Sequence, residues 1–123
     1  MSIDKRRCFR FNMELPAWFK NTHYQKDLSM ATTVNVSATG VCVATRELLE
    51  KGQQVLMQVK LSPEDRVVIR TKVVWVTEIP GTIVREYQAG LQLVEPMQFE
   101  EVKFVKFCAQ KMLEFWREQN NSI

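Results

Sequence analysis

The stretch SMATTVNVSATGVCVAT, Ser29–Thr45, contains two short runs rich in β-branched residues, and Ser37–Gly40 separates them. β-branched side chains favour strands, whereas a cluster of serine, threonine and glycine favours a turn. The stretch therefore predicts two strands that meet at a tight turn or a bulge. Asn35 and Ser37 are two positions apart, so their polar side chains are expected on the same face of the first strand.

Four other segments have the same β-type character. LPAWFK precedes the stretch at Leu15–Lys20, and three segments follow it: QQVLMQVKL at Gln53–Leu61, RVVIRTKVVWVTEI at Arg66–Ile79 and EYQAGLQLVE at Glu86–Glu95. Turns are expected at Lys51–Gly52 and Pro80–Gly81. Six short strands with no helical pattern between them favour an antiparallel barrel or sandwich. The length of Arg66–Ile79 predicts a bend or bulge midway.

The chain changes character after Pro96, because it has no further glycine or proline as far as Gln119. Apolar residues recur there at steps of three and four: Phe99, Val102, Val105, Ala109, Met112 and Trp116. This spacing predicts an α-helix over about residues 97–119, and Pro96 is a natural place for it to begin. The apolar stripe is expected to pack on one end or flank of the barrel.

The apolar surface of this helix is wider than one stripe. Phe104, Cys108 and Phe115 extend it on one side and Leu113 extends it on the other, whereas Phe107 projects from the polar side. The extra apolar area is a candidate contact with a second copy of the chain. A homodimer through the C-terminal helix is therefore an assembly to test.

Length and composition narrow the classes of protein to consider. A chain of 123 residues suits one domain, and 17 basic against 14 acidic residues give a net charge of +3. This charge is too mild to indicate nucleic-acid binding by itself. The chain has three cysteines without metal-type spacing and a single histidine, so neither a metal site nor a cofactor is expected.

The expected location is the cytoplasm. Free cysteines indicate a reducing compartment, no signal peptide is recognisable, and no apolar run reaches the ~20 residues that span a bilayer. Enzyme activity is not expected, since the sequence has no P-loop, no G-x-S-x-G and no H-E-x-x-H. His23 lies in a polar loop, and no base accompanies Cys8 in the sequence.

A cluster of cations opens the chain: KRRCFRF, Lys5–Phe11, contains Lys5, Arg6, Arg7 and Arg10. A guanidinium is a rigid planar fork that grips a phosphate, grips the O6/N7 edge of guanine, or stacks on a base. Two arginines on one short arm therefore suit a guanine nucleotide. Taken alone, the cluster favours a solvated basic tail over a ligand-binding arm.

Together these features resemble the PilZ domain family. The hallmark of that family is an R-x-x-x-R arm followed about 25 residues later by [DN]-x-S-x-x-G; this chain has Arg6-x-x-x-Arg10 and Asn35-x-Ser37-x-x-Gly40. RRCFRFNMELPAWF resembles the family's opening and TVNVSATGVCVAT its second and third strands. RTKVVWV resembles its strand with a common tryptophan, and YQAGLQLVE its closing strand. The resemblance covers roughly residues 5–95.

The resemblance implies an all-β fold with a C-terminal helix: a six-stranded antiparallel PilZ-type barrel that binds the bacterial second messenger cyclic di-GMP. Residues 1–123 would form a single PilZ domain, with a ligand-binding arm at 1–12, the barrel at about 13–95 and the helix at about 97–119. By position, Arg6 and Arg10 would wrap over the ligand, and the barrel residues Asn35, Ser37 and Gly40 would face it.

Three further residues are candidates for ligand contact. Lys5 stands where the family often has a basic residue, and Arg7 lies between the two arm arginines, where phosphate contact and solvent exposure are both open. Trp75 either lies in the core or flanks the bound guanine.

The implied function is that of a receptor and effector module. Cyclic di-GMP would order the arm over the barrel and change a surface that an unidentified effector protein reads. The alternative is a PilZ-like protein–protein adaptor that does not bind the nucleotide, although such members usually lack the arm arginines or the polar strand motif. Nucleic acid is not an expected partner, because Trp18, Phe19 and Trp75 form no aromatic set on a basic strand face.

Overall fold

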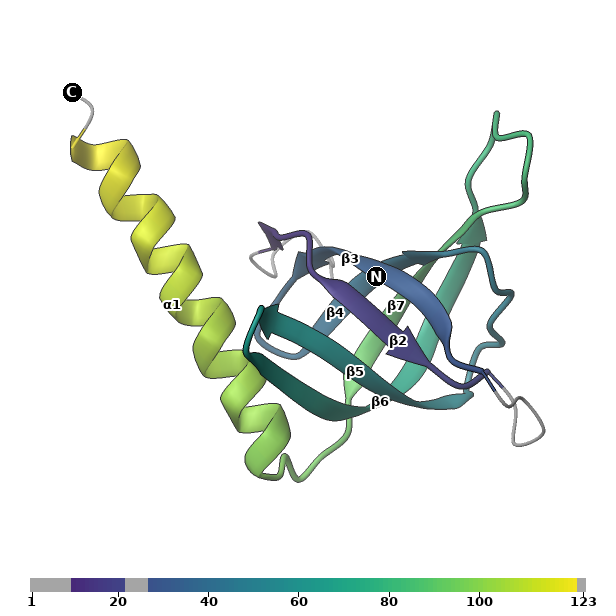
Figure 1. The fold of residues 1–123 in the computed structure, drawn as a ribbon, viewed down its shortest axis with the longest axis horizontal. Coiled ribbons are helices and arrows are strands. Elements are labelled where there is room, and N and C mark those ends of the chain that lie inside the picture. Colours follow the sequence, from purple (N-terminus) through teal and green to yellow (C-terminus); the bar gives the residue numbers. More distant parts are fainter. Residues whose placement is uncertain (1–9, 22–26, 122–123) are drawn as a thin grey trace, which may run out of the picture.

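The computed structural model describes residues 10–21 and 27–121, and it is built around a closed antiparallel β-barrel (Figure 1). Six strands form the barrel: β2 (Pro16–Phe19), β3 (Ser29–Val36), β4 (Gly40–Thr45), β5 (Gln54–Ser62), β6 (Asp65–Glu78) and β7 (Tyr87–Leu93). Their order is β3-β2-β5-β6-β7-β4, and β4 pairs with β3 to close the barrel. The six-stranded antiparallel barrel predicted from the sequence is confirmed.

A seventh strand, β1 (Phe11–Asn12), pairs antiparallel with the second half of β3. The sequence assigned these two residues to the N-terminal arm. The segment after them is fixed by the buried Thr33 side chain, which accepts a hydrogen bond from the Leu15 backbone N–H at 2.7 Å and donates one to the Met13 carbonyl oxygen. The arm therefore joins the barrel at β1, beside the strand that carries Asn35.

Two β-bulges set which side chains face outward. One lies in β3 between Thr33 and Asn35, and the other lies in β6 between Val73 and Trp75. An extra residue interrupts the alternation of a strand. Thr33 and Val73 are consequently buried inside the barrel, whereas Asn35 and Trp75 are half-buried on its outer face. The β6 bulge is the irregularity predicted midway along Arg66–Ile79.

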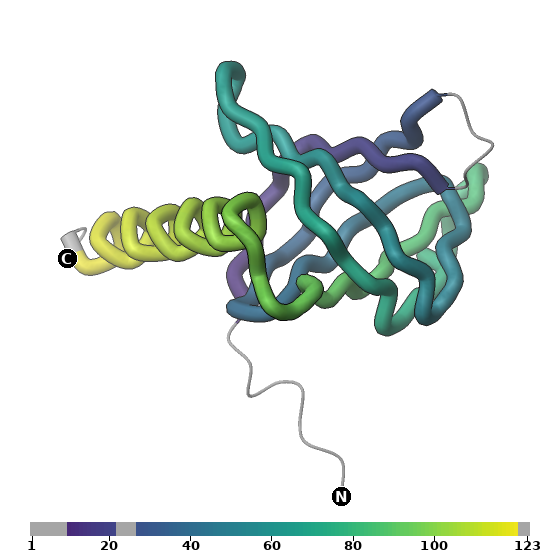
Figure 2. Tube along the Cα trace, turned by 90° about the horizontal axis from the view of Figure 1, so that it is seen from below, coloured from purple at the N-terminus to yellow at the C-terminus, as the bar shows by residue number. Residues whose placement is uncertain are grey.

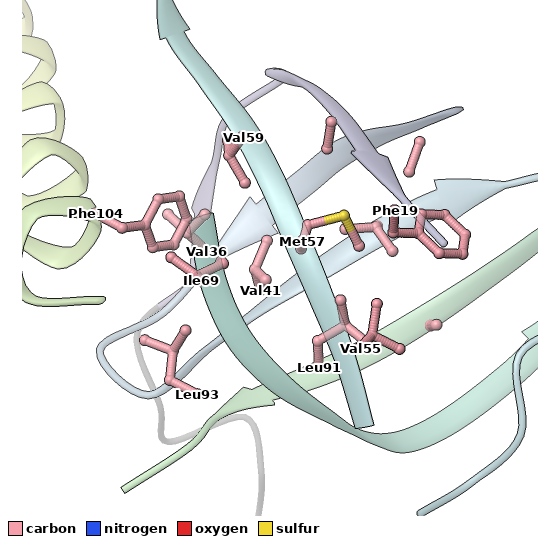
Figure 3. Packing of buried hydrophobic residues seen from close by; sticks show 14 of the residues in the cluster. Phe19, Val36, Val41, Val55, Met57, Val59, Ile69, Leu91, Leu93 and Phe104 are labelled. Carbon is pink, nitrogen blue, oxygen red and sulfur yellow. The ribbon is translucent and has the colours of Figure 1, made fainter. Parts of the chain in front are cut away.

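Aliphatic side chains fill the barrel around the fully buried Phe19 and Met57 (Figure 3). At one end, Phe104 of the helix α1 (Phe99–Asn121) enters the barrel beside Val36 and Ile69. Burying a side chain of this size contributes about 1.5–3 kcal/mol. Phe104 therefore ties the helix to the same core that holds the strands.

Only the first half of α1 covers the barrel, and the second half extends away from it (Figures 1 and 2). The helix begins at Phe99 rather than Met97, and its buried face consists of Glu101, Phe104 and Cys108. The expected stripe is only partly the packing face: Val105 packs against the core, whereas the end residues Phe99 and Trp116 are 79% and 58% exposed. The placement of Phe107 on the polar side is also wrong, because Phe107 packs against the core.

The rotation of α1 about its axis follows from contacts that Glu101 makes with β6. One carboxylate oxygen of Glu101 lies 2.6 Å from Nη2 of Arg70, and the other accepts the Arg70 backbone N–H at 3.2 Å. The same side chain accepts the Gln98 backbone N–H at 2.9 Å, which caps the first turn of the helix. These bonds turn the Glu101 side of α1 toward the barrel. No helix in the described part of the chain is long and apolar enough to cross a membrane.

Candidate functional site

The polar motif Asn35-x-Ser37-x-x-Gly40 forms the end of β3, a tight turn and the start of β4. The Ser37 backbone N–H donates to the Gly40 carbonyl oxygen at 2.9 Å across this turn. Gly40 does not have a positive φ. It is required for close approach, because a Cβ at this position would lie 2.4 Å from the Leu91 carbonyl oxygen of β7.

The hairpin starts a row of residues that crosses four strands on the outer face of the barrel. Asn35 of β3 pairs with Cys42 of β4, Cys42 pairs with Gly90 of β7, and Gly90 pairs with Trp75 of β6. We call these four residues the outer row. The register of the sheet thus brings Asn35 and Trp75, which are 40 positions apart in the sequence, onto one surface.

Trp75 covers the backbone of Gly90. A Cβ built on Gly90 would lie 2.1 Å from the indole Nε1 and 2.4 Å from Cε2, so only glycine leaves room for the ring. Trp75 is half-buried and does not belong to the core cluster. The alternative in which Trp75 is a core residue is therefore wrong, because the β6 bulge turns the side chain outward.

Arg10 lies at the Asn35 end of the outer row. It immediately precedes β1, in which Asn12 pairs with Asn35, and its side chain is exposed. Burial raises the pKa of the Cys42 thiol, and the positive charge of Arg10 partly offsets that rise. The Arg10 guanidinium is thus close enough to the outer row to act on it electrostatically. Lys5, Arg6 and Arg7 lie outside the described residues.

The outer row leaves several polar groups available to a ligand. The Asn35 amide and the Trp75 indole N–H make no hydrogen bond with another described residue. Within the described residues, the Ser37 hydroxyl has only a long contact of 3.4 Å, with the Gly40 carbonyl oxygen. An amide, a hydroxyl, an aromatic ring and a guanidinium suit a planar ligand that has both hydrogen-bonding edges and negative charge. In residues 10–21 and 27–121 no group of acidic, histidine or cysteine side chains could hold a metal ion.

The large hollow on the barrel surface does not coincide with this site. A hollow of about 1310 Å³ lies elsewhere, and its lining includes Lys20, Leu48, Glu50, Leu56 and Arg70. None of Arg10, Asn35, Ser37, Gly40 or Trp75 lines it. The outer row is therefore a site apart from that hollow.

Sequence reasoning missed Cys42 and Gly90. A two-residue turn at 38–39 would have paired Asn35 with Cys42 by simple counting, so the hairpin contained that signal. The contact between Gly90 and Trp75 had no such signal, because it depends on a bulge in β6 and on the pairing of β6 with β7.

Comparisons with known proteins match both the sequence and the fold. A family model described as PilZ domain matches residues 4–110. The PilZ domain of YcgR from Escherichia coli, solved with c-di-GMP, superposes with a TM-score of 0.71 at 11% identity, covering 98% of this chain and 100% of that one. No curated protein matches the chain.

Two longer structures have the same fold over part of their length. The K. pneumonia MrkH–c-di-GMP complex gives a TM-score of 0.70 at 15% identity, covering 98% of this chain and 57% of MrkH. The Bacillus subtilis inhibitor of motility (MotI/DgrA) gives 0.65 at 17% identity, covering 91% of this chain and 53% of that one. This chain thus spans about half the length of these two neighbours.

Proposed function

This chain belongs to the PilZ domain family, and from that premise we propose that it is a receptor for cyclic di-GMP and not an enzyme. The observation that carries the proposal is the outer row with Arg10 at its end, because it gathers a guanidinium, an amide and an indole on one surface. As a receptor for a bacterial second messenger, the protein would act in the cytoplasm of a bacterium.

Each site residue has a distinct role in this proposal. Arg10 and Arg6 hold the phosphates and guanine edges of the ligand, since a guanidinium can grip either one with two parallel hydrogen bonds. Asn35 and Ser37 hydrogen-bond the guanine from the barrel. Gly40 lets the start of β4 approach β7 closely at the turn that follows Ser37. Trp75 flanks the base with its ring, while Lys5 and Arg7 add positive charge on the arm.

Binding also has a route to the helix. Phe11, one residue after Arg10, packs against the core and meets Phe115 of α1 edge-to-face, with ring centroids 5.6 Å apart. A ligand that fixes Arg10 over the outer row acts on β1, and β1 touches the extended half of α1 through this pair. The surface that an effector protein reads is therefore the second half of α1.

The extended half of α1 also suits self-association. Leu113, Phe115 and Trp116 are 57%, 48% and 58% exposed, which is unusual for residues of this size in a helix of a monomer. A homodimer through α1 would cover them.

Isothermal titration calorimetry with cyclic di-GMP tests the receptor function. The wild-type chain should bind, and Arg10→Ala and Arg6→Ala should each abolish measurable binding while the thermal unfolding temperature stays the same. The matched control is Arg85→Ala, which removes an exposed arginine from the hairpin between β6 and β7 and should bind as the wild type does. Full-strength binding by the Arg10 variant would refute the site, and absence of binding by the wild type would favour the adaptor alternative.

A further inference from the structure

A second surface of the barrel has an unusual charge composition. The outward-facing positions of β5 and of the first half of β6 include Lys60, Arg66, Arg70 and Lys72, and Lys20 directly follows β2. No carboxylate occupies an outward position on β2, on β5 or on Arg66–Lys72 of β6, although the whole chain has 14 acidic residues. Positive charge is therefore concentrated on one side of an almost neutral protein. We call this side, together with the apolar residues Trp18, Met30 and Leu56, the basic face.

Two of these cations oppose each other directly. Lys60 of β5 and Arg66 of β6 are cross-strand partners, and neither makes an ion pair with another described residue. Like charges at directly opposite positions destabilise an antiparallel pair by several tenths of a kcal/mol. Arg70 lies four residues further along β6 and is instead neutralised by Glu101. The Lys60–Arg66 pair is thus a local cost that the fold alone does not explain.

Large apolar side chains lie among the cations. The Arg66 guanidinium sits 5.2 Å from the ring centroid of Trp18, and Trp18 pairs with Met30 on β3. Met30 is 68% exposed. Leu56 on β5, the strand on the other side of β2, is 60% exposed. Leu56 also borders the hollow of about 1310 Å³, so the apolar patch continues into a concave surface. Tryptophan, methionine and arginine are the side chains enriched at the centres of protein interfaces.

The number of cations argues against a DNA duplex as the partner. Binding to a duplex typically uses about six to ten phosphate contacts. With Arg70 neutralised, the basic face has four cations: Lys20, Lys60, Arg66 and Lys72. Four is at the lower limit of the about four to eight clustered cations of a polybasic membrane site, so binding to vesicles is the measurement that decides that class. Single-stranded nucleic acid would need several stacking aromatics, and Trp18 is the one aromatic side chain among the outward positions of β2, β5 and Arg66–Lys72.

We infer that the basic face docks a protein partner through a segment that combines acidic and large apolar side chains. Carboxylates of the partner neutralise Lys60 and Arg66, and its apolar side chains cover Trp18, Met30 and Leu56. The face uses β2, β5, the first half of β6 and Met30 at the start of β3, whereas the outer row begins at Asn35 near the other end of β3 and ends at Trp75. The docking surface therefore needs no residue of the nucleotide site, and it is a second protein-binding surface besides the extended half of α1.

The test uses peptides displayed as a random library and selected on the full chain, followed by calorimetry with the purified winners. Selected peptides should be rich in Asp and Glu next to Leu, Phe or Trp, and their affinity should fall as salt rises. Lys60→Glu should weaken binding at least about tenfold, a loss of about 1.4 kcal/mol. The same substitution replaces a like-charge pair by an opposite-charge pair with Arg66, so the unfolding temperature should stay equal or rise.

The matched control is Lys106→Glu, which makes the same charge change at an exposed position of α1 and should leave peptide binding intact. The inference is overturned if selection yields no peptides or peptides without acidic excess, or if Lys60→Glu binds them at full strength. It is also overturned if a short DNA duplex, or vesicles of phosphatidylcholine and phosphatidylglycerol, bind more tightly than the peptides.

Arg10→Ala separates this inference from the proposed nucleotide site. That variant should lose cyclic di-GMP and keep the peptides, whereas Lys60→Glu should do the reverse. Loss of peptide binding in the Arg10 variant would contradict a docking surface that is independent of the outer row.

Discussion

At the scale of single residues, the candidate site depends on one glycine as much as on its polar groups. Gly90 has no side chain to offer a ligand, but its bare backbone leaves the space that the Trp75 indole occupies on the outer face. The orientation of the indole, and with it the shape of the surface around Asn35, follows from that contact. Gly90, which has no side chain, thus positions the Trp75 indole.

Gly90→Ala should destabilise the protein by about 1–3 kcal/mol, because the new Cβ overlaps the indole and forces it off the strand. Urea unfolding measures the change. In a Trp75→Ala background the indole is gone, so Gly90→Ala should cost much less, with a coupling of at least about 1 kcal/mol in the double-mutant cycle. Equal costs in both backgrounds would show that Trp75 does not lie on Gly90.

The sequence predicted the position of the polar motif in the fold better than the orientation of Trp75. Asn35, Ser37 and Gly40 could be placed on a strand and a turn, because the motif and the local propensities agree. The direction of Trp75 could not be predicted, since alternation was counted through a strand whose bulge shifts it. The need for glycine at position 40 comes from close packing against β7 and not from its φ, a contact between segments far apart in the sequence.

At the scale of elements, the six barrel strands and the helix were predictable because each has a clear period of its own. β1 was not, since two residues have no periodicity, and only its pairing with β3 makes it a strand. The rotation of α1 was also beyond the sequence. Of the predicted stripe Val105 packs against the core, but the buried face begins at Glu101, because the bonds between Glu101 and Arg70 hold that carboxylate against the barrel.

Glu101→Gln should destabilise the protein by about 3 kcal/mol at neutral pH, as removing one partner of a buried ion pair does. The measurement is urea unfolding at pH 7. The control is Glu114→Gln, whose pair with Lys111 is about half exposed at 3.4 Å and should be worth less than about 0.5 kcal/mol. Equal effects of the two substitutions would contradict the role of Glu101 as the anchor of α1.

The Glu101 carboxyl makes the free energy of unfolding depend on pH. Burial raises the pKa of Glu101, but hydrogen bonds from Arg70 and Gln98 and the charge of Arg70 outweigh it, so the pKa lies below the ordinary value of 4.5. The stabilisation is therefore complete above pH 4.5 and is lost as the pH falls through the lower folded-state pKa. Unfolding free energy measured from about pH 6 down to pH 3 should fall more steeply for the wild type than for Glu101→Gln.

At the scale of the whole molecule, the extended half of α1 decides the assembly. Light scattering after size exclusion should show a dimer at high concentration, and Trp116→Lys should shift it to the monomer, since a charge would be buried in the helix contact. Ile83→Lys is the matched control, because Ile83 is fully exposed at the tip of the hairpin between β6 and β7. A wild-type monomer at every concentration tested would rule the dimer out.

The signal should travel through the contact between Phe11 and Phe115. Phe11→Ala removes an edge-to-face pair worth about 0.5–1.5 kcal/mol and leaves Arg10, Asn35 and Trp75 in place. Cyclic di-GMP should therefore still bind the variant. In the wild type the ligand should change amide hydrogen exchange in residues 109–121. In Phe11→Ala and in Phe115→Ala that change should disappear.

The control is Phe99→Ala, which removes an exposed aromatic side chain from the other end of α1 and should respond to the ligand as the wild type does. If the Phe11 variant binds the ligand and hydrogen exchange in α1 still changes, the contact between Phe11 and Phe115 does not couple the site to the helix. The packing of Phe104 into the barrel would then be the contact to test next.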